Sequence, residues 1–311
     1  MNKFSLLSFS LLILILSGCS EEDRYLSSIR RVPVQELSPS CEQALDQYDL
    51  KEPSFIYKSG ENFILADHFS KYCVDVINIS SGSKTGLFRK GRGPKEALVP
   101  YITVYNGNLI LYDISNVTCV RLNPVNKDIW YASRGFDGAC RSTVSAPAYP
   151  ELKRMSDDLY WSFLLSTHYA VNPDESAVCA AMVNSPTLSF SRIENGNLKE
   201  VKRYQEAAPE FSEDGETFSS NSRRAFSRPV GYGDKVYVLY SGQPLKGSDD
   251  GYPPYECKHL IEYAWDGNPV RHFVLSEPIS AFCIEGDMLF ALSNYPETRI
   301  LQYSLNHKRR N

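Results

Sequence analysis

The sequence predicts an all-β protein with the architecture of a six-bladed β-propeller. A short strand that follows a polar turn returns five times along the chain, and a second strand follows each copy. Short strands repeated with a period of about 40 to 50 residues are typical of propeller blades. Almost no segment shows the apolar spacing of a long amphipathic helix, so the repeat is expected to consist of strands alone.

The first strand of the repeat is recognised by the turn before it. Each copy follows Gly, Asn or Asp residues, which favour the tight turns of β-hairpins. Successive copies begin 46, 50, 77 and 53 positions apart. The five copies are residues 63–67, 109–113, 159–163, 236–240 and 289–293.

The second strand of the repeat alternates apolar and polar residues, which indicates a half-exposed strand. Two of its copies continue through a turn into an outer strand, at residues 198–204 and 270–275. Such an outer hairpin is what a propeller blade requires. The five copies of the second strand are residues 74–78, 120–123, 188–192, 261–265 and 301–305.

The number of blades follows from the spacing of these strands. Five blades are visible, and the wide gap between the copies at residues 159 and 236 leaves room for a sixth. No outer strand follows residue 305, and residues 29–37 are expected to supply it, which would pair both termini in one sheet and remove an exposed edge. A β-sandwich is the alternative fold, although it does not return the same strand pair at a blade-length period.

The first residues of the chain have the pattern of an export signal. Lys3 precedes an apolar run from Leu6 to Leu16, which is shorter than the roughly 20 apolar residues that a membrane span needs. The run ends in Leu16-Ser17-Gly18-Cys19, which resembles the bacterial lipobox, and this resemblance implies that Cys19 carries the lipid. A core helix that ends in a buried Cys19 is the alternative, but the run is apolar all round rather than amphipathic.

Three regions follow from these observations. Residues 1–18 are predicted to be a lipoprotein signal peptide, residues 19–47 a lipidated cysteine and tether with room for the blade-closing strand, and residues 48–311 the six-bladed β-propeller. Acidic residues 21–23 resemble the signal that sends Bacteroidetes lipoproteins to the outer face of the outer membrane, with a solvated linker as the alternative. We therefore expect a lipid-anchored outer-membrane protein that is exposed at the cell surface or, alternatively, faces the periplasm.

The composition is that of a globular domain, with 42% hydrophobic and 12% aromatic residues. The net charge is −4 and no basic face is evident, so we exclude nucleic-acid binding. Seven cysteines follow Cys19, and this odd number leaves at least one thiol unpaired. Cys73, Cys119 and Cys283 lie in strand-like runs and are expected to be buried. The Cys and His spacings fit no zinc site, and we expect neither a metal nor a cofactor.

One stretch of the sequence resembles a known family. Residues 90–96, Lys-Gly-Arg-Gly-Pro-Lys-Glu, are similar to the GxGPxEF signature of the six-bladed, TolB-like β-propeller lipoproteins of Bacteroidetes, although Ala97 stands where the signature has an aromatic residue. Residues 236–305 resemble the last two blades of that family. The resemblance covers most of the mature chain and implies a fold and a location more than an activity.

Loop lengths predict which face would bind a ligand. The interval between the first and second strands of the repeat is 7 residues in the first two copies and 8 in the last. It is 25 from residue 163 to 188 and 21 from residue 240 to 261. Both insertions would emerge on one face, and loops longer than about 12 residues in a compact domain are usually functional or disordered.

The candidate ligand-binding residues lie in three places. These are the two long insertions, the Gly-Pro loop at residues 90–96 and the basic pair Arg223-Arg224. The loop before residue 256 combines carboxylates with tyrosines, a mixture that can stack on a sugar and accept its hydroxyl hydrogen bonds. Each region also has a structural alternative. The tyrosine-containing loop could simply pack on itself, the Gly-Pro loop could form a tight backbone crossing, and the basic pair could be solvated surface charge. The candidates are Arg92, Lys95, His168, Arg223, Asp249, Asp250, Tyr252 and Tyr255.

No catalytic motif is evident: the sequence has no GxSxG, HExxH or phosphate-binding loop pattern. Asp67 and Asp113 stand at equivalent strand ends and are interpreted as turn-capping residues rather than as a glycosidase pair. We therefore expect a binding or scaffold module that reaches the membrane through its lipid anchor and binds a carbohydrate, a peptide or an envelope protein. The alternative is a polysaccharide hydrolase or lyase with an active site on the central face, for which His168 and Asp249 are the residues to test. A metal or lyase site formed by His168 and His259, both in the long insertions, is a weaker alternative.

Overall fold

The computed structural model describes residues 23–93, 96–98, 100–105, 108–113, 118–122, 129–133, 166–205, 211–212, 217–247 and 251–306. These residues hold 21 strands and only two short helical segments, α1 (Arg24–Ser28) and the 3₁₀ turn η1 (Asp46–Tyr48). The expectation of an all-β protein is confirmed.

The described strands form five sheets, and three of these are meanders of four antiparallel strands. The first contains β3 (Pro53–Ser59), β4 (Asn62–Asp67), β5 (Tyr72–Asn78) and β6 (Ser83–Arg89). The second contains β7 (Pro100–Tyr105), β8 (Asn108–Asp113), β9 (Thr118–Leu122) and β10 (Ile129–Ser133). The third contains β11 (Thr167–Val171), β12 (Ala177–Met182), β13 (Thr187–Glu194) and β14 (Asn197–Gln205).

N-terminal strands complete the other two sheets. One is a meander of β15 (Val230–Tyr232), β16 (Lys235–Tyr240), β17 (Cys257–Ala264) and β18 (Pro269–Ile279), to which β1 (Val34–Leu37) adds in parallel. The other contains β19 (Ala281–Glu285), β20 (Met288–Ser293) and β21 (Arg299–Ser304), and β2 (Cys41–Ala44) pairs antiparallel with β21. The strand that completes the last sheet is therefore β2, and not residues 29–37 as the sequence suggested.

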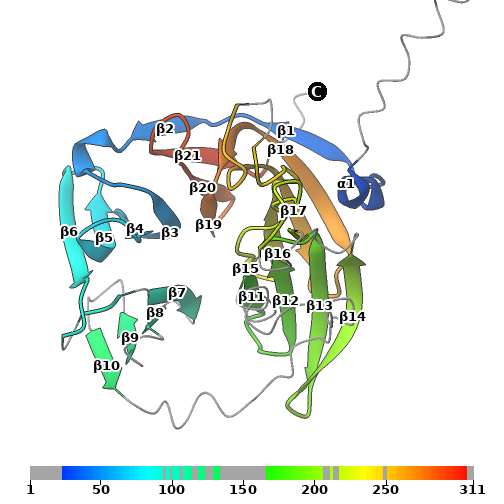
Figure 1. Ribbon diagram of the computed structural model, residues 1–311, viewed down its shortest axis with the longest axis horizontal. Coiled ribbons are helices and arrows are strands. Elements are labelled where there is room, and N and C mark those ends of the chain that lie inside the picture. The colour runs from blue at the N-terminus through cyan, green and yellow to red at the C-terminus, as the bar shows by residue number, and fades with distance from the viewer. Residues whose placement is uncertain are drawn as a thin grey trace, which may run out of the picture.

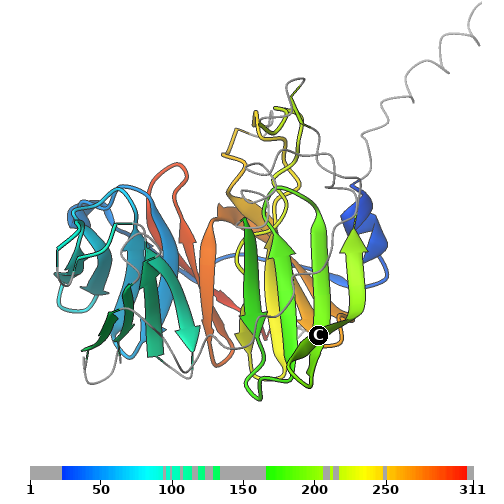
Figure 2. The ribbon, with the colours of Figure 1, turned by 60° about the horizontal axis from the view of Figure 1, so that its bottom comes forward.

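The five sheets stand around a common centre, and the first strand of each meander lies nearest to it (Figure 1). Among these inner strands, β19 contacts both β3 and β15, and β15 also contacts β11. In Figure 2, the segments before β15 and between β16 and β17 stand above one end of the sheets. Within the described residues the sheets are not closed into a ring, so the expected six blades are not shown.

The hydrophobic core lies between neighbouring sheets. The cluster between β11–β14 and β15–β18 is built on Phe190, Tyr240 and Tyr263 and also takes in Tyr25 from α1. Comparable clusters join β15–β18 to β19–β21, β19–β21 to β3–β6, and β3–β6 to β7–β10. Each large apolar side chain buried in this way contributes about 1.5 to 3 kcal/mol, and the clusters fix each sheet against the next.

Most of the strands expected from the repeat are confirmed. Its first strand corresponds to β4, β8, β16 and β20, and its second to β5, β9, β13, β17 and β21. The copy at residues 159–163 lies outside the described residues. The partner of β13 is β12, so the expected long insertion between residues 163 and 188 is wrong, because its second half forms the hairpin of β11 and β12.

Asp23, the first residue that the structure describes, is four positions after the predicted lipid anchor. One Asp23 carboxylate oxygen accepts the Leu26 N–H at 3.1 Å and caps α1, while the other accepts the Tyr240 hydroxyl at 2.8 Å. The buried Tyr25 hydroxyl bonds that of Tyr263. Within residues 19–47, which the sequence assigned to the lipidated cysteine and tether, α1 packs against the core and β1 and β2 are paired into sheets.

The cysteines whose side chains are described form no disulfide with one another: Cys41, Cys73, Cys179, Cys257 and Cys283. Cys73 and Cys283 are buried in β5 and β19, as expected, whereas the side chain of Cys119 in β9 lies outside the described residues. Burial raises the pKa of Cys257 and of Cys283 to about 12, so these thiols stay protonated and inert at neutral pH.

Candidate functional site

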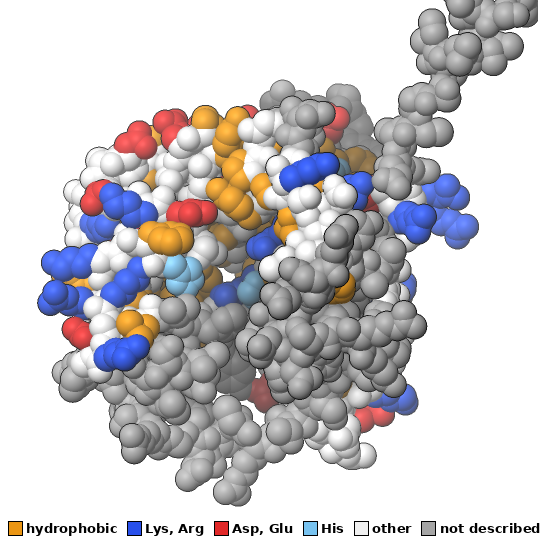
Figure 3. All heavy atoms as spheres, in the orientation of Figure 1, with side chains coloured by type: hydrophobic (Ala, Val, Ile, Leu, Met, Phe, Trp, Pro, Cys, Tyr) orange, Lys and Arg blue, Asp and Glu red, His pale blue; other side chains and the backbone are white. Residues whose placement is uncertain are grey.

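A cavity of about 690 Å³ opens where the inner strands meet. Residues of β3, β7, β11, β15 and β19 all line it, so every described sheet contributes to its wall. The volume lies within the roughly 300 to 1,000 Å³ range of pockets that hold small-molecule ligands. Figure 3 shows the corresponding hollow near the middle of this face, with basic and histidine side chains around it. This central cavity is the candidate site.

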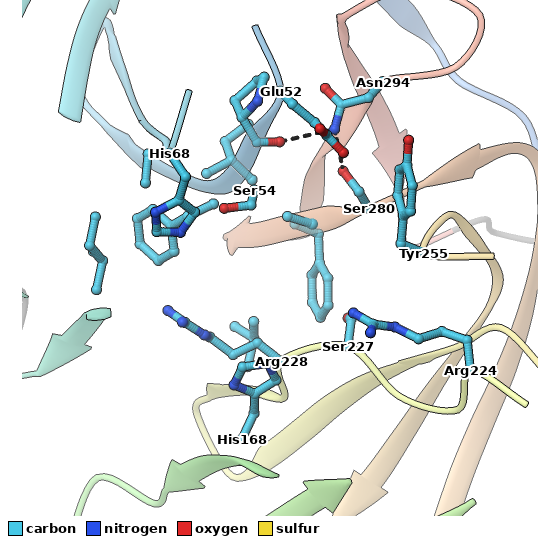
Figure 4. Close-up of a pocket in the computed structure, with 18 of the residues that line it drawn as sticks. Glu52, Ser54, His68, His168, Arg224, Ser227, Arg228, Tyr255, Ser280 and Asn294 are labelled. Atoms are coloured by element: carbon cyan, nitrogen blue, oxygen red, sulfur yellow. Dashed lines mark hydrogen bonds between the residues drawn. The ribbon is translucent and has the colours of Figure 1, made fainter. Parts of the chain in front are cut away.

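The cationic wall of the cavity is carried by residues 222–228, which connect two sheets. The Ala225 N–H donates to the Val183 carbonyl at 2.7 Å, just beyond β12, and the Ser241 N–H, just beyond β16, donates to the Ala225 carbonyl at 2.8 Å. These bonds hold the segment between the ends of two strands. Arg224 and Arg228 from this segment point into the cavity (Figure 4).

The two guanidinium groups are held in different ways. Arg224 donates one hydrogen bond to Asn184 Oδ1 at 3.4 Å and makes no ion pair with any carboxylate among the described residues. The Arg228 guanidinium lies 5.6 Å from the centroid of the Phe55 ring, a cation–π arrangement. A planar guanidinium on a concave wall is suited to bind a carboxylate, sulfate or phosphate by two parallel hydrogen bonds.

The pKa values of two histidines in the cavity are lowered by burial and by the positive charges of this wall. Burial and the charges of Arg228 and Arg224 lower the pKa of His168, on β11, to about 3. The pKa of His68, which follows β4, is also lowered, first by desolvation and then by the charges of Lys90 and Arg228. Both imidazoles are therefore neutral at physiological pH and can donate or accept hydrogen bonds without adding charge.

The opposite wall is polar and carries one acidic residue, Glu52. Figure 4 shows Glu52, Ser54, Ser280, Asn294 and Tyr255 across the cavity from Arg224 and Arg228. The Asn294 amide donates to the Pro53 carbonyl at 2.9 Å and to Ser280 Oγ at 3.1 Å, which fixes its position. These side chains offer hydrogen-bond acceptors and donors of the kind that sugar hydroxyls need.

Behind this wall lies a buried carboxyl group, Glu256. Its Oε1 accepts the Asn294 N–H at 2.9 Å, and its other oxygen has no hydrogen-bond partner among the described residues. Burial raises the pKa of Glu256 to about 8, so this side chain is mainly neutral at pH 7. Glu256 therefore adds little negative charge behind this wall at pH 7.

Aromatic rings are exposed at the mouth of the cavity. Phe69 is 70% exposed and Tyr255 is 37% exposed, and both line the cavity. An exposed large aromatic ring has no role in the core, and such rings commonly pack against a ligand. The cavity therefore combines cations, hydroxyl-binding groups and aromatic surfaces.

Two of the residues predicted from the sequence line the cavity, His168 and Tyr255. Three others do not line it: Arg92 is exposed, the Arg223 guanidinium donates to the Gly242 carbonyl at 2.7 Å, and Tyr252 lies beneath the Lys258 ammonium. The remaining candidates lie outside the described residues, namely Cys19, Lys95, Asp249 and Asp250.

The sequence did not single out Arg228, His68 or Glu52 as ligand-binding residues, and it marked Arg224 only as the neighbour of the candidate Arg223 in a basic pair. For His68 the local signal is its position after the strand-end Asp67. The Asp67 carboxylate accepts the N–H groups of Lys51, Phe69 and Ser70 within 3.1 Å, so its turn-capping role is confirmed. The equivalent residue Asp113 ends β8, and its side chain lies outside the described residues.

No metal site is evident in the described part of the chain, which holds no cluster of three or more His, Cys, Asp or Glu side chains. The histidines that the sequence placed together, His168 and His259, do not both line the cavity. His259 instead pairs with His272, with 3.0 Å between their ring nitrogens. Among the described helices, none has the length and apolar character to span a membrane.

The comparisons with known proteins give structural resemblances only. No protein-family model matches the chain, and no curated protein matches it. A protein of Bacteroides fragilis that is predicted to be exported matches 87% of this chain and 77% of its own, with 11% identity and a TM-score of 0.39. A member of the DUF4221 family from Bacteroides vulgatus matches 86% of this chain and 97% of its own, with 10% identity and a TM-score of 0.46. Similarity at this level assigns no function.

Proposed function

We propose that the protein is a binding protein of the cell envelope whose central cavity holds a carbohydrate bearing an acidic group. The observation that carries this proposal is the pair of guanidinium groups, Arg224 and Arg228, on one wall of the cavity. Since Arg224 has no carboxylate partner among the described residues, its charge is available to a ligand. An incoming carboxylate or sulfate would supply the missing partner.

The other walls favour a sugar over a simple anion. Glu52 and Asn294 can bond hydroxyl groups, and Phe69 and Tyr255 offer faces against which a sugar ring can pack. A small inorganic anion would leave most of a 690 Å³ cavity empty. A ligand of one to a few sugar units would use all of these surfaces.

A catalytic role receives less support from the same residues. His168 would be the proton acceptor of a lyase, but a pKa of about 3 makes it a weak base at neutral pH. Glu256 would retain a proton at pH 7, but it does not line the cavity. Binding without turnover is therefore the function that we propose.

The location and the complete architecture belong to the same proposal. Lipidation of Cys19 would hold the domain at the outer membrane, and Asp23, the first described residue, is only four residues away. Four residues extend to at most about 14 Å, so the domain would sit close to the bilayer. The arrangement of five meanders around one centre supports a six-bladed, TolB-like propeller.

A saccharide array tests the proposed function. The purified protein is expected to bind saccharides that carry uronate or sulfate groups and not their neutral counterparts. Arg224→Gln is expected to remove the signal, whereas Lys199→Gln, on the outer strand β14, is expected to retain it. Binding of neutral saccharides alone, or no binding across a broad acidic panel, would contradict the proposal.

A further inference from the structure

A row of basic groups leads from the edge of the domain into the central cavity. At its outer end are three residues that we call the rim cations, Lys71, Lys90 and Arg92. The Lys90 N–H donates to the Lys71 carbonyl at 3.1 Å, which places these two residues side by side. Lys71 and Arg92 are exposed and Lys90 is partly exposed.

The rim cations are joined to the cavity through His68. His68 lines the cavity, and Lys71, three residues later in the chain, carries the carbonyl that accepts the Lys90 N–H. The pKa of His68 is lowered first by desolvation and then by the charges of Lys90 and Arg228. The pKa of the other cavity histidine, His168, is lowered by desolvation and by the charges of Arg228 and Arg224. Figure 3 shows the result as Lys and Arg side chains on one rim, followed by histidine side chains toward the central hollow.

The rim cations have no acidic partner in the described part of the chain. Lys58 pairs with Glu285 and Lys84 with Asp75 at 3.3 Å, whereas no described carboxylate lies within 4 Å of a rim cation's charged nitrogen. The nearby Glu96 is occupied within its own loop, because its Oε2 accepts the Gly93 N–H at 2.8 Å. Their positive charge is therefore not neutralised locally.

From this arrangement we infer that the ligand is an acidic oligosaccharide of several units, which fills the cavity with one end and extends over the rim cations with the other. The inference rests on the proposed function, since the end in the cavity is the acidic sugar described above. Regularly spaced carboxylate or sulfate groups would meet first Arg224 and Arg228 and then the rim cations. The exposed Phe69 ring, at the cavity mouth next to His68, lies where the chain would leave the cavity.

Nucleic acid is the other polyanion that a basic row could bind, and the observations favour a glycan. Glu52 in the cavity would face a phosphate chain, whereas sugar hydroxyls can donate to it. Single-stranded DNA therefore serves as one arm of the test.

Calorimetric titration of the full chain in detergent with galacturonate, its trimer and its hexamer tests the inference. We expect the hexamer to bind at least tenfold more tightly than the monomer at about 0.1 M salt. The rim variant Lys71→Ala/Lys90→Ala/Arg92→Ala should lose this gain while its affinity for the monomer changes less than twofold. The control variant Lys199→Ala/Arg203→Ala/Lys235→Ala removes the same charge from β14 and β16 and should retain the gain.

Three results would overturn the inference: equal affinity for monomer and hexamer, a full length-dependent gain in the rim variant, or an equal loss in the control variant. Equal or tighter binding of a six-nucleotide DNA would also overturn it, in favour of a general polyanion site. If the monomer binds but length adds nothing, the proposed function stands and this inference fails. If none of the three galacturonates binds, the proposed function and this inference both fail for uronates. Titration of the matching sulfated hexasaccharide into the same variants then decides between carboxylate and sulfate ligands.

Discussion

The hydroxyl groups of Tyr25 and Tyr263 are expected to stabilise the protein as a pair. Tyr25 is 1% exposed and its ring centroid lies 4.9 Å from that of Phe226 and 4.5 Å from that of Tyr240. Burial raises the pKa of both phenols well above the ordinary value, so both keep their protons and one donates to the other. This bond ties the first helix of the folded chain to β17, a strand more than two hundred residues later.

The expected loss of stability depends on whether a substitution leaves a buried hydroxyl group unpaired. Tyr25→Phe keeps the ring but leaves the buried Tyr263 hydroxyl without its partner, which costs about 1 to 3 kcal/mol. Tyr263→Phe leaves the buried Tyr25 hydroxyl without its partner and should cost a similar amount. The double variant leaves no unpaired hydroxyl, so its loss should be smaller than the sum of the two single losses by at least about 0.5 kcal/mol.

Guanidinium denaturation of the four proteins, followed by tryptophan fluorescence and circular dichroism, measures this coupling. Tyr25→Ala should lose more, about 3 to 5 kcal/mol, because a cavity remains where the ring was. The reasoning is refuted if Tyr25→Phe is as stable as the parent protein, or if the two single losses simply add. Either result would mean that α1 does not hold its place through this bond.

Three further predictions concern other parts of the chain. Because the pKa of Glu256 is about 8 when folded and lies near 4.5 when unfolded, its own contribution to stability should be largest below pH 4.5 and fall, by a few kcal/mol in total, as the pH rises to 8. Relative to the parent protein, Glu256→Gln should therefore gain stability between pH 5 and 8 in a pH series of denaturation curves, and an unchanged difference would count against this. Gly86→Ala should cost about 1 to 3 kcal/mol in thermal or denaturant melts, because its Cβ would lie 2.2 Å from the Tyr72 ring, and an unchanged melt would show that the ring can move aside. Cys19→Ser should move the protein from the membrane fraction to the soluble fraction of lysed cells, whereas retention in the membrane would argue against the acyl anchor.

The strands could be predicted where local pattern determines them. Copies such as β16 and β20 carry a turn signal followed by a buried apolar run, and both were found from the sequence. The strand β12 was missed because it reads Ala-Val-Cys-Ala-Ala-Met: alanine is disfavoured in strands, and burial of both faces removes the alternation. The strand β2 was missed because it is polar, and only its pairing with β21 makes it a strand.

The candidate site was less predictable because its residues come together only through the sheets. Arg223 and Arg224 are neighbours of the same type, yet only Arg224 lines the cavity. Their different directions depend on how residues 222–228 bond to the ends of β12 and β16, which the local sequence does not encode. His168 was a candidate from the sequence and lines the cavity, although the sequence placed it in a loop that the structure shows to be the strand β11.

The central claim is that the cavity recognises an acidic group on a sugar, and one titration addresses it directly. Galacturonate and galactose differ only in that one carries a carboxylate where the other has a hydroxymethyl group, so comparing them isolates this contact. We predict that galacturonate binds at least tenfold more tightly than galactose, and that Arg224→Gln/Arg228→Gln abolishes the difference. Equal affinity for the two sugars, or a preference for galacturonate that survives the double substitution, would contradict the account.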